Sequence, residues 1–214
     1  MHRTFKTIFF LVALASFILL VLPHRCFAEN PQVTVFVCND ALVPAEILAH
    51  AEGQAGRIFG RVGVNVNWLD CTTAISANCT PPLETGGPVR LNLRIIPNAA
   101  VSTSEQIFGV AYLAPDGTGQ YGDVFWLQTK DLQTDSKVNL ASILGSVMAH
   151  EMGHLLLGSN SHAISGIMLA HWGPNELRRI GMGSFLFLPG QGRRMRARAS
   201  QRAELLHVRQ ELGD

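Results

Sequence analysis

The segment His150-Glu151-Met152-Gly153-His154 contains the residue types of a metal-dependent hydrolase. An α-helix has 3.6 residues per turn, so histidines four positions apart lie on one face and can bind the same metal ion. A catalytic zinc site has three protein ligands and one open position for water. The segment therefore predicts that His150 and His154 bind Zn²⁺ and that Glu151 acts as general base on the water.

Apolar residues surround this motif at helical spacing, which predicts a buried helix that begins near Lys137. Burying two histidines and a carboxylate is costly unless a metal ion or a full set of hydrogen bonds compensates for the lost water. This context favours a metal site over a chance occurrence of the motif.

The third zinc ligand must come from the residues that follow the helix. Gly158 is expected to end the helix, because glycine adopts the left-handed conformation of a C-terminal cap at little cost. We expect His162 to be the third ligand, since imidazole binds zinc better than a carboxamide does. Asn160 is the alternative, and His171 is a further candidate whose simpler interpretation is a surface histidine.

Residues 138–168 resemble the metzincin (matrixin-like) metallopeptidases, whose signature H-E-x-x-H-x-x-G-x-x-H is followed by a methionine turn beneath the zinc. Ser165-Gly166-Ile167-Met168 is similar to that Met-turn. In an ungapped alignment, however, the family glycine falls on Leu157 and the third family histidine falls on Asn160. The loop that carries the third ligand therefore differs from the family pattern.

The resemblance implies a zinc peptidase in which Met168 forms an apolar floor under the ligands. Some members of the family also use a tyrosine to support the oxyanion, and Tyr121 is a candidate for that role only by elimination. A strand at the edge of the cleft, here residues 107–113, would pair with an extended peptide substrate.

Alternating and β-branched residues predict five strands, at residues 32–37, 64–69, 89–96, 106–113 and 123–128. Further helices are predicted from Pro44 to about Phe59 and from Pro174 to about Ile180. The resemblance implies the same order of elements. The expected fold is α+β (α/β/α-like), with a mixed, mostly parallel five-stranded sheet, an active-site helix, a Met-turn and C-terminal helices.

Residues 1–28 have the pattern of a secretory signal peptide, with basic residues, an apolar core and a terminal Ala28. An uncleaved membrane anchor is the alternative. We therefore expect a secreted or periplasmic protein with a single domain over residues 29–214.

Three cysteines follow the predicted signal peptide. Cys71 and Cys79 bracket a polar loop and are expected to form a disulfide in an oxidising compartment, which leaves Cys38 unpaired. The simple interpretation of Cys38 is a small buried residue at a strand end, and a thiolate that blocks the zinc in a latent form is the alternative.

The formal net charge of +1 indicates no nucleic-acid partner. Residues 190–214 are basic and predict a helix or tail, with an apolar stripe of Leu205, Leu206 and Val208 packed on the domain. Weak contact of this tail with an anionic membrane surface is the alternative. The expected partner is a peptide or protein substrate, and the protein is expected to be monomeric.

The sequence therefore predicts an exported zinc-dependent endopeptidase. Two alternatives remain: a zinc-binding protein with little turnover, in which Asn160 or His171 closes the site, and an envelope interaction protein in which the motif has no catalytic role.

Overall fold

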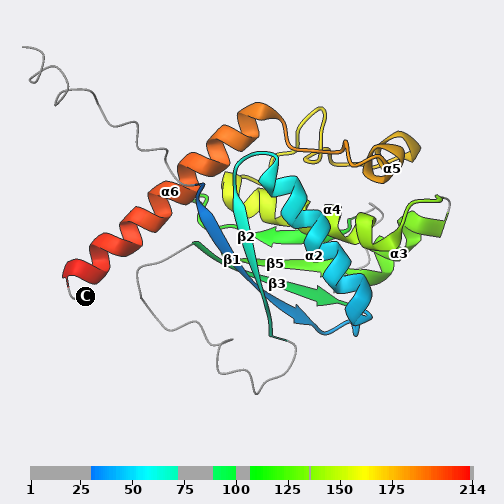
Figure 1. Cartoon of the computed structure of the whole chain (residues 1–214), viewed down its shortest axis with the longest axis horizontal. Coiled ribbons are helices and arrows are strands. Elements are labelled where there is room, and N and C mark those ends of the chain that lie inside the picture. Colours follow the sequence, from blue (N-terminus) through cyan, green and yellow to red (C-terminus); the bar gives the residue numbers. More distant parts are fainter. Residues whose placement is uncertain (1–29, 72–88, 100–106, 135, 213–214) are drawn as a thin grey trace, which may run out of the picture.

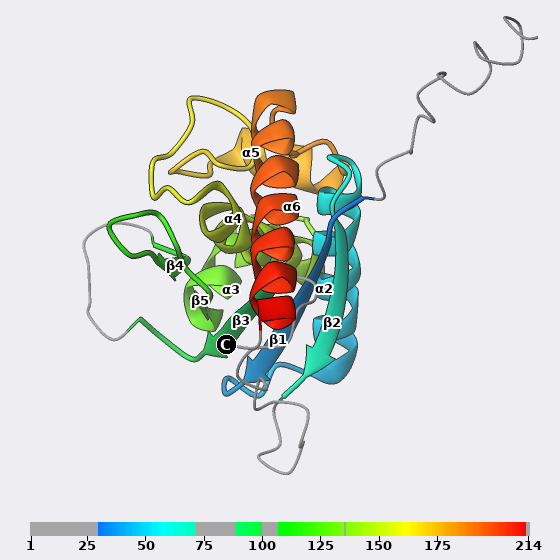
Figure 2. The same ribbon diagram turned by 90° about the vertical axis from the view of Figure 1, so that its left-hand side faces the viewer.

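A computed structural model describes residues 30–71, 89–99, 107–134 and 136–212 of the chain. The predicted signal peptide and Cys79 lie outside the described residues. The centre of the molecule is a five-stranded sheet with the order β2-β1-β3-β5-β4 (Figures 1 and 2). Its strands are β1 (Gln32–Asn39), β2 (Asn65–Asp70), β3 (Val89–Ile96), β4 (Gly109–Tyr112) and β5 (Tyr121–Phe125).

The sheet is mostly parallel, as predicted. β1 pairs in parallel with β2 and β3, and β3 pairs in parallel with β5. β4 runs antiparallel to β5 and forms one edge of the sheet. The segment expected at the edge of the cleft is therefore an edge strand, shorter than the predicted 106–113.

The helices are α2 (Ala45–Gly60), α3 (Trp126–Thr134), α4 (Leu140–Leu157), α5 (Pro174–Gly181) and α6 (Pro189–Leu212). α2 packs against α4 and β2, while α4 also contacts β3, β4 and β5 (Figures 1 and 2). Alternate strand residues such as Val35, Leu91 and Leu93 are buried in the resulting core. The histidine-bearing helix thus lies against the sheet beside its β4 edge.

Within the described residues, α4 is the one helix long and apolar enough to cross a membrane by length and composition. Of this helix, 89% is buried inside the protein. It begins at Leu140 rather than near Lys137, because the side chain of Asn139 caps it by accepting a hydrogen bond from the Ala141 amide at 2.8 Å.

The prediction of a strand over residues 123–128 was wrong beyond Phe125, since α3 begins at Trp126. The aromatic pair Phe125-Trp126 favours a strand by propensity alone. Tertiary packing overrides that preference: Thr129 and Leu132 are buried on one face of α3, and the Thr129 hydroxyl donates to the Phe125 carbonyl at 2.8 Å.

α6 occupies most of the region predicted to be a basic helix or tail, but a different face is buried. Met195 and Ala199 are buried in the core, whereas Leu205 and Val208 are 59% and 46% exposed. The predicted apolar stripe was therefore wrong in its position, and the side chain of Leu206 lies outside the described part of the chain.

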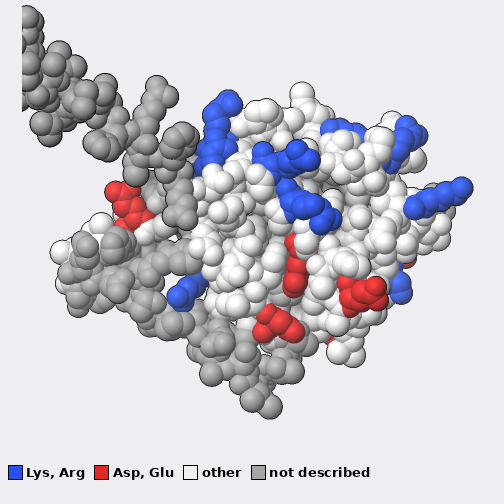
Figure 3. Space-filling model, viewed as in Figure 1, with Lys and Arg blue, Asp and Glu red and all other residues white. Residues whose placement is uncertain are grey.

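Three arginines of α6 donate hydrogen bonds to backbone carbonyls of the domain: Arg196 to Val62, Arg198 to Gly117 and Arg202 to Gly119. Figure 3 shows scattered Lys and Arg side chains with uncharged surface between them on one face of the molecule. Part of the positive charge of α6 therefore lies on side chains that hydrogen-bond α6 to the rest of the domain.

Candidate metal centre

Two histidines of α4 and one from the following loop come together. His150, His154 and His162 each offer a ring nitrogen, and these nitrogens all lie within 4.8 Å of one another. His150 and His154 are buried, whereas His162 is exposed. The three predicted ligands therefore form one cluster that is open to solvent on the His162 side.

Hydrogen bonds to backbone carbonyls set the tautomers of the two buried histidines. The Nδ1 atom of His150 lies 2.7 Å from the Ile167 carbonyl oxygen, and the Nδ1 atom of His154 lies 2.7 Å from the Ser159 carbonyl oxygen. A carbonyl oxygen only accepts, so each Nδ1 must carry the proton. In the neutral rings, each Nε2 then presents a lone pair.

These two lone pairs face each other, because the Nε2 atoms of His150 and His154 are 3.0 Å apart. Burial lowers the pKa of His150 to about 3, with a further contribution from His154, and burial also lowers the pKa of His154. A proton between the two rings is therefore disfavoured. A divalent cation resolves the repulsion, and ligands of a tetrahedral zinc ion are separated by about 3.3 Å for Zn–N bonds of about 2.0 Å. The side chains thus fit a zinc ion.

Glu151 lies in the same cleft as the three histidines and is buried against β4. Burial raises the pKa of its carboxyl to about 8, because the charged form loses water. A divalent cation held by the neighbouring histidines would favour the ionised form again. The carboxylate and the histidine cluster are therefore electrostatically complementary once a metal is bound.

Gly109 leaves the space that Glu151 occupies. A Cβ atom added at Gly109 would lie 2.6 Å from Cγ of Glu151 and 2.6 Å from the carbonyl oxygen of Asp123. The strand glycine therefore permits a close approach of β4 to the catalytic candidate, and β4 keeps a regular ladder with β5 through Gly109.

We expect Gly109→Ala to destabilise the fold by about 1–3 kcal/mol, because the added methyl group must displace Glu151 or the β4 backbone. Urea unfolding of the purified proteins measures this loss. Gly60→Ala is the matched control, since a Cβ atom at Gly60 meets nothing within 4 Å. Equal unfolding free energies for Gly109→Ala and the unmutated protein would contradict the close packing described here.

The chain turns back directly after α4. Gly158 caps the helix with φ 63° and ψ 39°, in the left-handed region, and its amide donates to the His154 carbonyl. A Cβ atom here would overlap the guanidinium of Arg198 from α6. Glycine is thus required at this position both by the backbone conformation and by the side chain packed against it.

Met168 packs beneath the ligand-bearing turn of α4. Its side chain is fully buried, and a Cβ atom added at Gly153, which lies between the two ligand positions of the helix, would be 2.7 Å from its Sδ. The preceding turn has Gly166 at φ +75°, and the amide of Ala163 donates to the Met168 carbonyl at 2.8 Å. This turn also places the Ile167 carbonyl against His150.

Sequence reasoning did not identify Trp172 as a supporting residue. Its indole is buried and meets the His150 ring edge to face, with ring centres 5.7 Å apart. Its Nε1 donates to the Leu169 carbonyl at 2.9 Å. The one available signal was an aromatic residue shortly after the turn at Met168, which specifies no contact by itself.

Several other candidates lie away from the histidine cluster. Tyr121, a candidate by elimination for the oxyanion-supporting residue, is 58% exposed on β5 and does not line the histidine cleft, so the structure does not favour that candidate. Cys38 is free and lines a separate groove with Arg94 and Asp123, so the zinc-blocking alternative was wrong. His171 lines the cleft but is outside the ligand cluster.

Cys71 is buried just after β2. Its predicted partner, Cys79, lies outside the described residues, so the pairing stays a prediction.

The cleft has a volume of about 250 Å³. Residues 107–111, which include the start of β4, line the cleft together with Asn160, His162 and His171. The arrangement places a buried carboxylate and a potential metal ion beside an edge strand. Such a site can hydrolyse a carbonyl compound, and the edge strand can hold an extended chain.

No protein-family model matches this sequence, and no curated protein matches it. Among solved structures, the chain is similar to archaemetzincin from Methanopyrus kandleri, with 14% sequence identity and a TM-score of 0.49. The match covers 84% of this chain and 99% of the archaemetzincin chain. A similarity of this degree does not establish a family.

Proposed function

We propose that this protein is an exported zinc-dependent endopeptidase with Glu151 as general base. One observation carries the proposal: the unprotonated Nε2 atoms of His150 and His154 face each other at 3.0 Å, with His162 in the same cluster. Export is proposed on the signal-peptide pattern of residues 1–28.

His150, His154 and His162 would hold the zinc ion, and the exposed side of the cluster leaves a position for water. A zinc ion bound there would supply Lewis acidity toward a water molecule and toward the scissile carbonyl. Glu151 takes the proton from the attacking water and delivers it to the leaving amine. Met168, whose Sδ packs against Gly153, would form the apolar floor under the ligands that the Met-turn resemblance implies.

The position of β4 at the edge of the described sheet supports a peptide as substrate. An edge strand presents backbone amides and carbonyls that an extended peptide can pair with as an added strand. β4 contributes Gly109, Val110 and Ala111 to the wall of the histidine cleft. A peptide on this edge would therefore have its backbone carbonyls beside Glu151 and the metal.

The test is cleavage of a set of fluorescence-quenched peptides by the purified protein. We expect cleavage that stops when a chelator removes the metal and returns when zinc is added in stoichiometric amount, because the facing Nε2 lone pairs of His150 and His154 favour a bound cation. The His150→Ala variant, treated in the same way, is the control, and addition of zinc should restore no peptide cleavage by this variant. Chelator-insensitive cleavage, or no cleavage by the zinc-loaded protein, would contradict the proposal.

A zinc-binding protein with little turnover is the second candidate, because Asn160 and His171 both line the cleft and either side chain can close the fourth position. Stoichiometric zinc without cleavage of any peptide, in both the unmutated protein and an Asn160→Ala variant, would favour this second candidate.

A further inference from the structure

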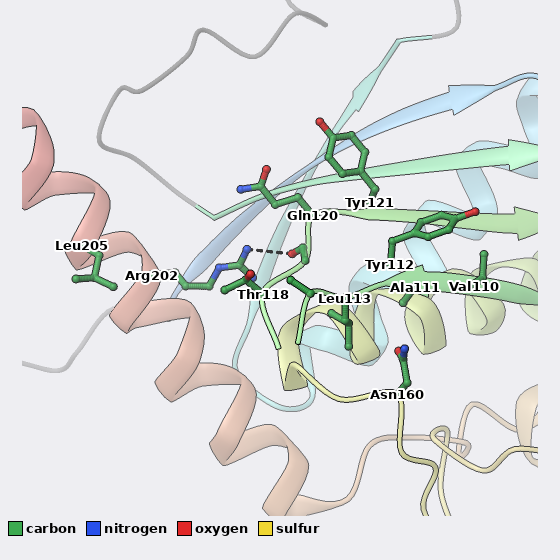
Figure 4. A pocket seen from close by; sticks show the side chains of 12 residues that line it. Val110, Ala111, Tyr112, Leu113, Thr118, Gln120, Tyr121, Asn160, Arg202 and Leu205 are labelled. Carbon is green, nitrogen blue, oxygen red and sulfur yellow. Dashed lines mark hydrogen bonds between the residues drawn. The ribbon is translucent and has the colours of Figure 1, made fainter. Parts of the chain in front are cut away.

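A second, larger groove adjoins the histidine cleft. It has a volume of about 870 Å³ and lies between the loop that follows β4 and the C-terminal half of α6 (Figure 4). Its lining includes Ala111, Leu113, Tyr121, Asn160, Arg202 and Leu205. Pockets that bind small molecules usually have volumes of about 300–1,000 Å³, so this groove has room for a large side chain, whereas the histidine cleft is smaller.

The two depressions adjoin each other along β4 and share lining residues. Val110, Ala111 and Asn160 line both the histidine cleft and the larger groove. Because β4 is an edge strand, a peptide that pairs with it would pass from the first to the second. Gly109 packs on Glu151, and Leu113 lies four residues further on, which is about 13 Å of extended chain. A peptide residue about four positions from the scissile bond would reach the groove.

The lining of the groove is mainly apolar and contains one cationic group. Ala111 of β4 and Leu113, which follows β4, supply aliphatic surface on one side, and Leu205 supplies it from α6, where this leucine is 59% exposed. Arg202 donates from Nη2 to the Gly119 carbonyl at 3.0 Å, which holds its guanidinium at the wall. No carboxylate is present among the described residues that line the groove. The groove therefore favours an apolar side chain and disfavours Lys or Arg.

We propose that this groove binds a large apolar side chain of the peptide substrate, about four residues from the cleaved bond. The inference rests on the proposed peptidase function, because it takes its occupant from the peptide that lies along β4. It adds that α6, which lies outside the histidine cleft, determines the sequence preference of the site.

The test measures binding, so that it does not depend on turnover. Labelled peptides of one length carry Phe, Ala or Lys at one position at a time, and fluorescence anisotropy gives their affinity for the zinc-loaded Glu151→Gln protein. We expect one position at which the Phe peptide binds about tenfold or more tightly than the Ala and Lys peptides, as burial of a large side chain predicts.

Leu205→Arg should abolish this preference, because it places a second cation in the groove. Leu212→Arg is the matched control, since Leu212 is also an exposed leucine of α6, at 73%, but does not line the groove. A Phe preference that survives Leu205→Arg, equal affinities for all three peptides, or no binding of any peptide would overturn the inference.

The outcomes separate the groove from the catalytic proposal. The Phe preference could be lost in Leu205→Arg while the protein with Glu151 intact cleaves none of the bound peptides. That result would support side-chain binding in the groove and contradict the peptidase function. If peptides are cleaved without any such preference, the peptidase function is supported and the inference about side-chain binding in the groove is contradicted.

Discussion

Replacement of His154 by Ala is expected to abolish stoichiometric zinc binding. Two facing Nε2 lone pairs at 3.0 Å form the centre of the site, and the variant removes one of them. Loss of a mere hydrogen-bond partner of a zinc ligand costs 10–100-fold in affinity, so loss of the ligand itself should cost more than about 100-fold. Elemental analysis of the purified protein and a zinc titration by calorimetry measure the effect.

The increase in melting temperature on addition of zinc is a second measure of the same site. Because zinc binds the folded state, it should raise the melting temperature of the unmutated protein and leave that of His154→Ala unchanged. Comparing each protein with and without metal cancels the cost of the cavity left by the buried imidazole. His50→Ala, which changes an exposed histidine of α2, should keep the full increase. A variant at His154 that still gains stability from stoichiometric zinc would contradict the site.

The same measurement decides the third ligand. A ring nitrogen of His162 belongs to the cluster, and Asn160, two residues earlier in the chain, lines the cleft. His162→Ala should therefore lose zinc, whereas Asn160→Ala should keep it. The reverse result would assign the carboxamide as ligand, as the ungapped family alignment implies.

The grouping of the two helical histidines was predictable because it depends on local spacing. Histidines four residues apart on a helix must share a face, so the His150–His154 pair could be placed from the sequence alone. Gly158 was predictable for the same reason, since a glycine after a helical pattern has few other functions at that position. Strand alternation likewise located most of the sheet, including β3, which was predicted with its observed bounds.

Contacts between distant segments were not predictable in this way. The packing of Arg198 against Gly158 joins two segments forty residues apart, and no local pattern specifies it. The close approach of Gly109 to Glu151 likewise depends on which strand forms the sheet edge beside α4. α3 was missed because burial of Thr129 and Leu132 outweighs the strand propensity of the preceding aromatic residues.

Replacement of Glu151 by Gln is expected to leave zinc binding intact and to reduce kcat/KM by about 10²–10⁴-fold, the usual contribution of a general base. The histidines keep their carbonyl partners in this variant, since the bonds of His150 to Ile167 and of His154 to Ser159 do not involve Glu151. Glu46→Gln, an exposed residue in the first turn of α2, is the control and should change neither quantity.

This loss of activity should occur without loss of stability. Burial raises the pKa of the Glu151 carboxyl from 4.5 to about 8, so the metal-free fold favours the neutral form. A carboxyl whose pKa is higher in the folded state stabilises the fold below pH 4.5, and that contribution is lost as the pH rises through about 8. The amide of Gln stays neutral as the pH rises, so the variant does not lose this contribution to stability. In the metal-free state at high pH, the Glu151→Gln variant should therefore unfold at a urea concentration equal to or above that of the unmutated protein. An inactive variant that is also unfolded or zinc-free would assign Glu151 a structural role, whereas an inactive, stable and zinc-loaded variant identifies it as the base.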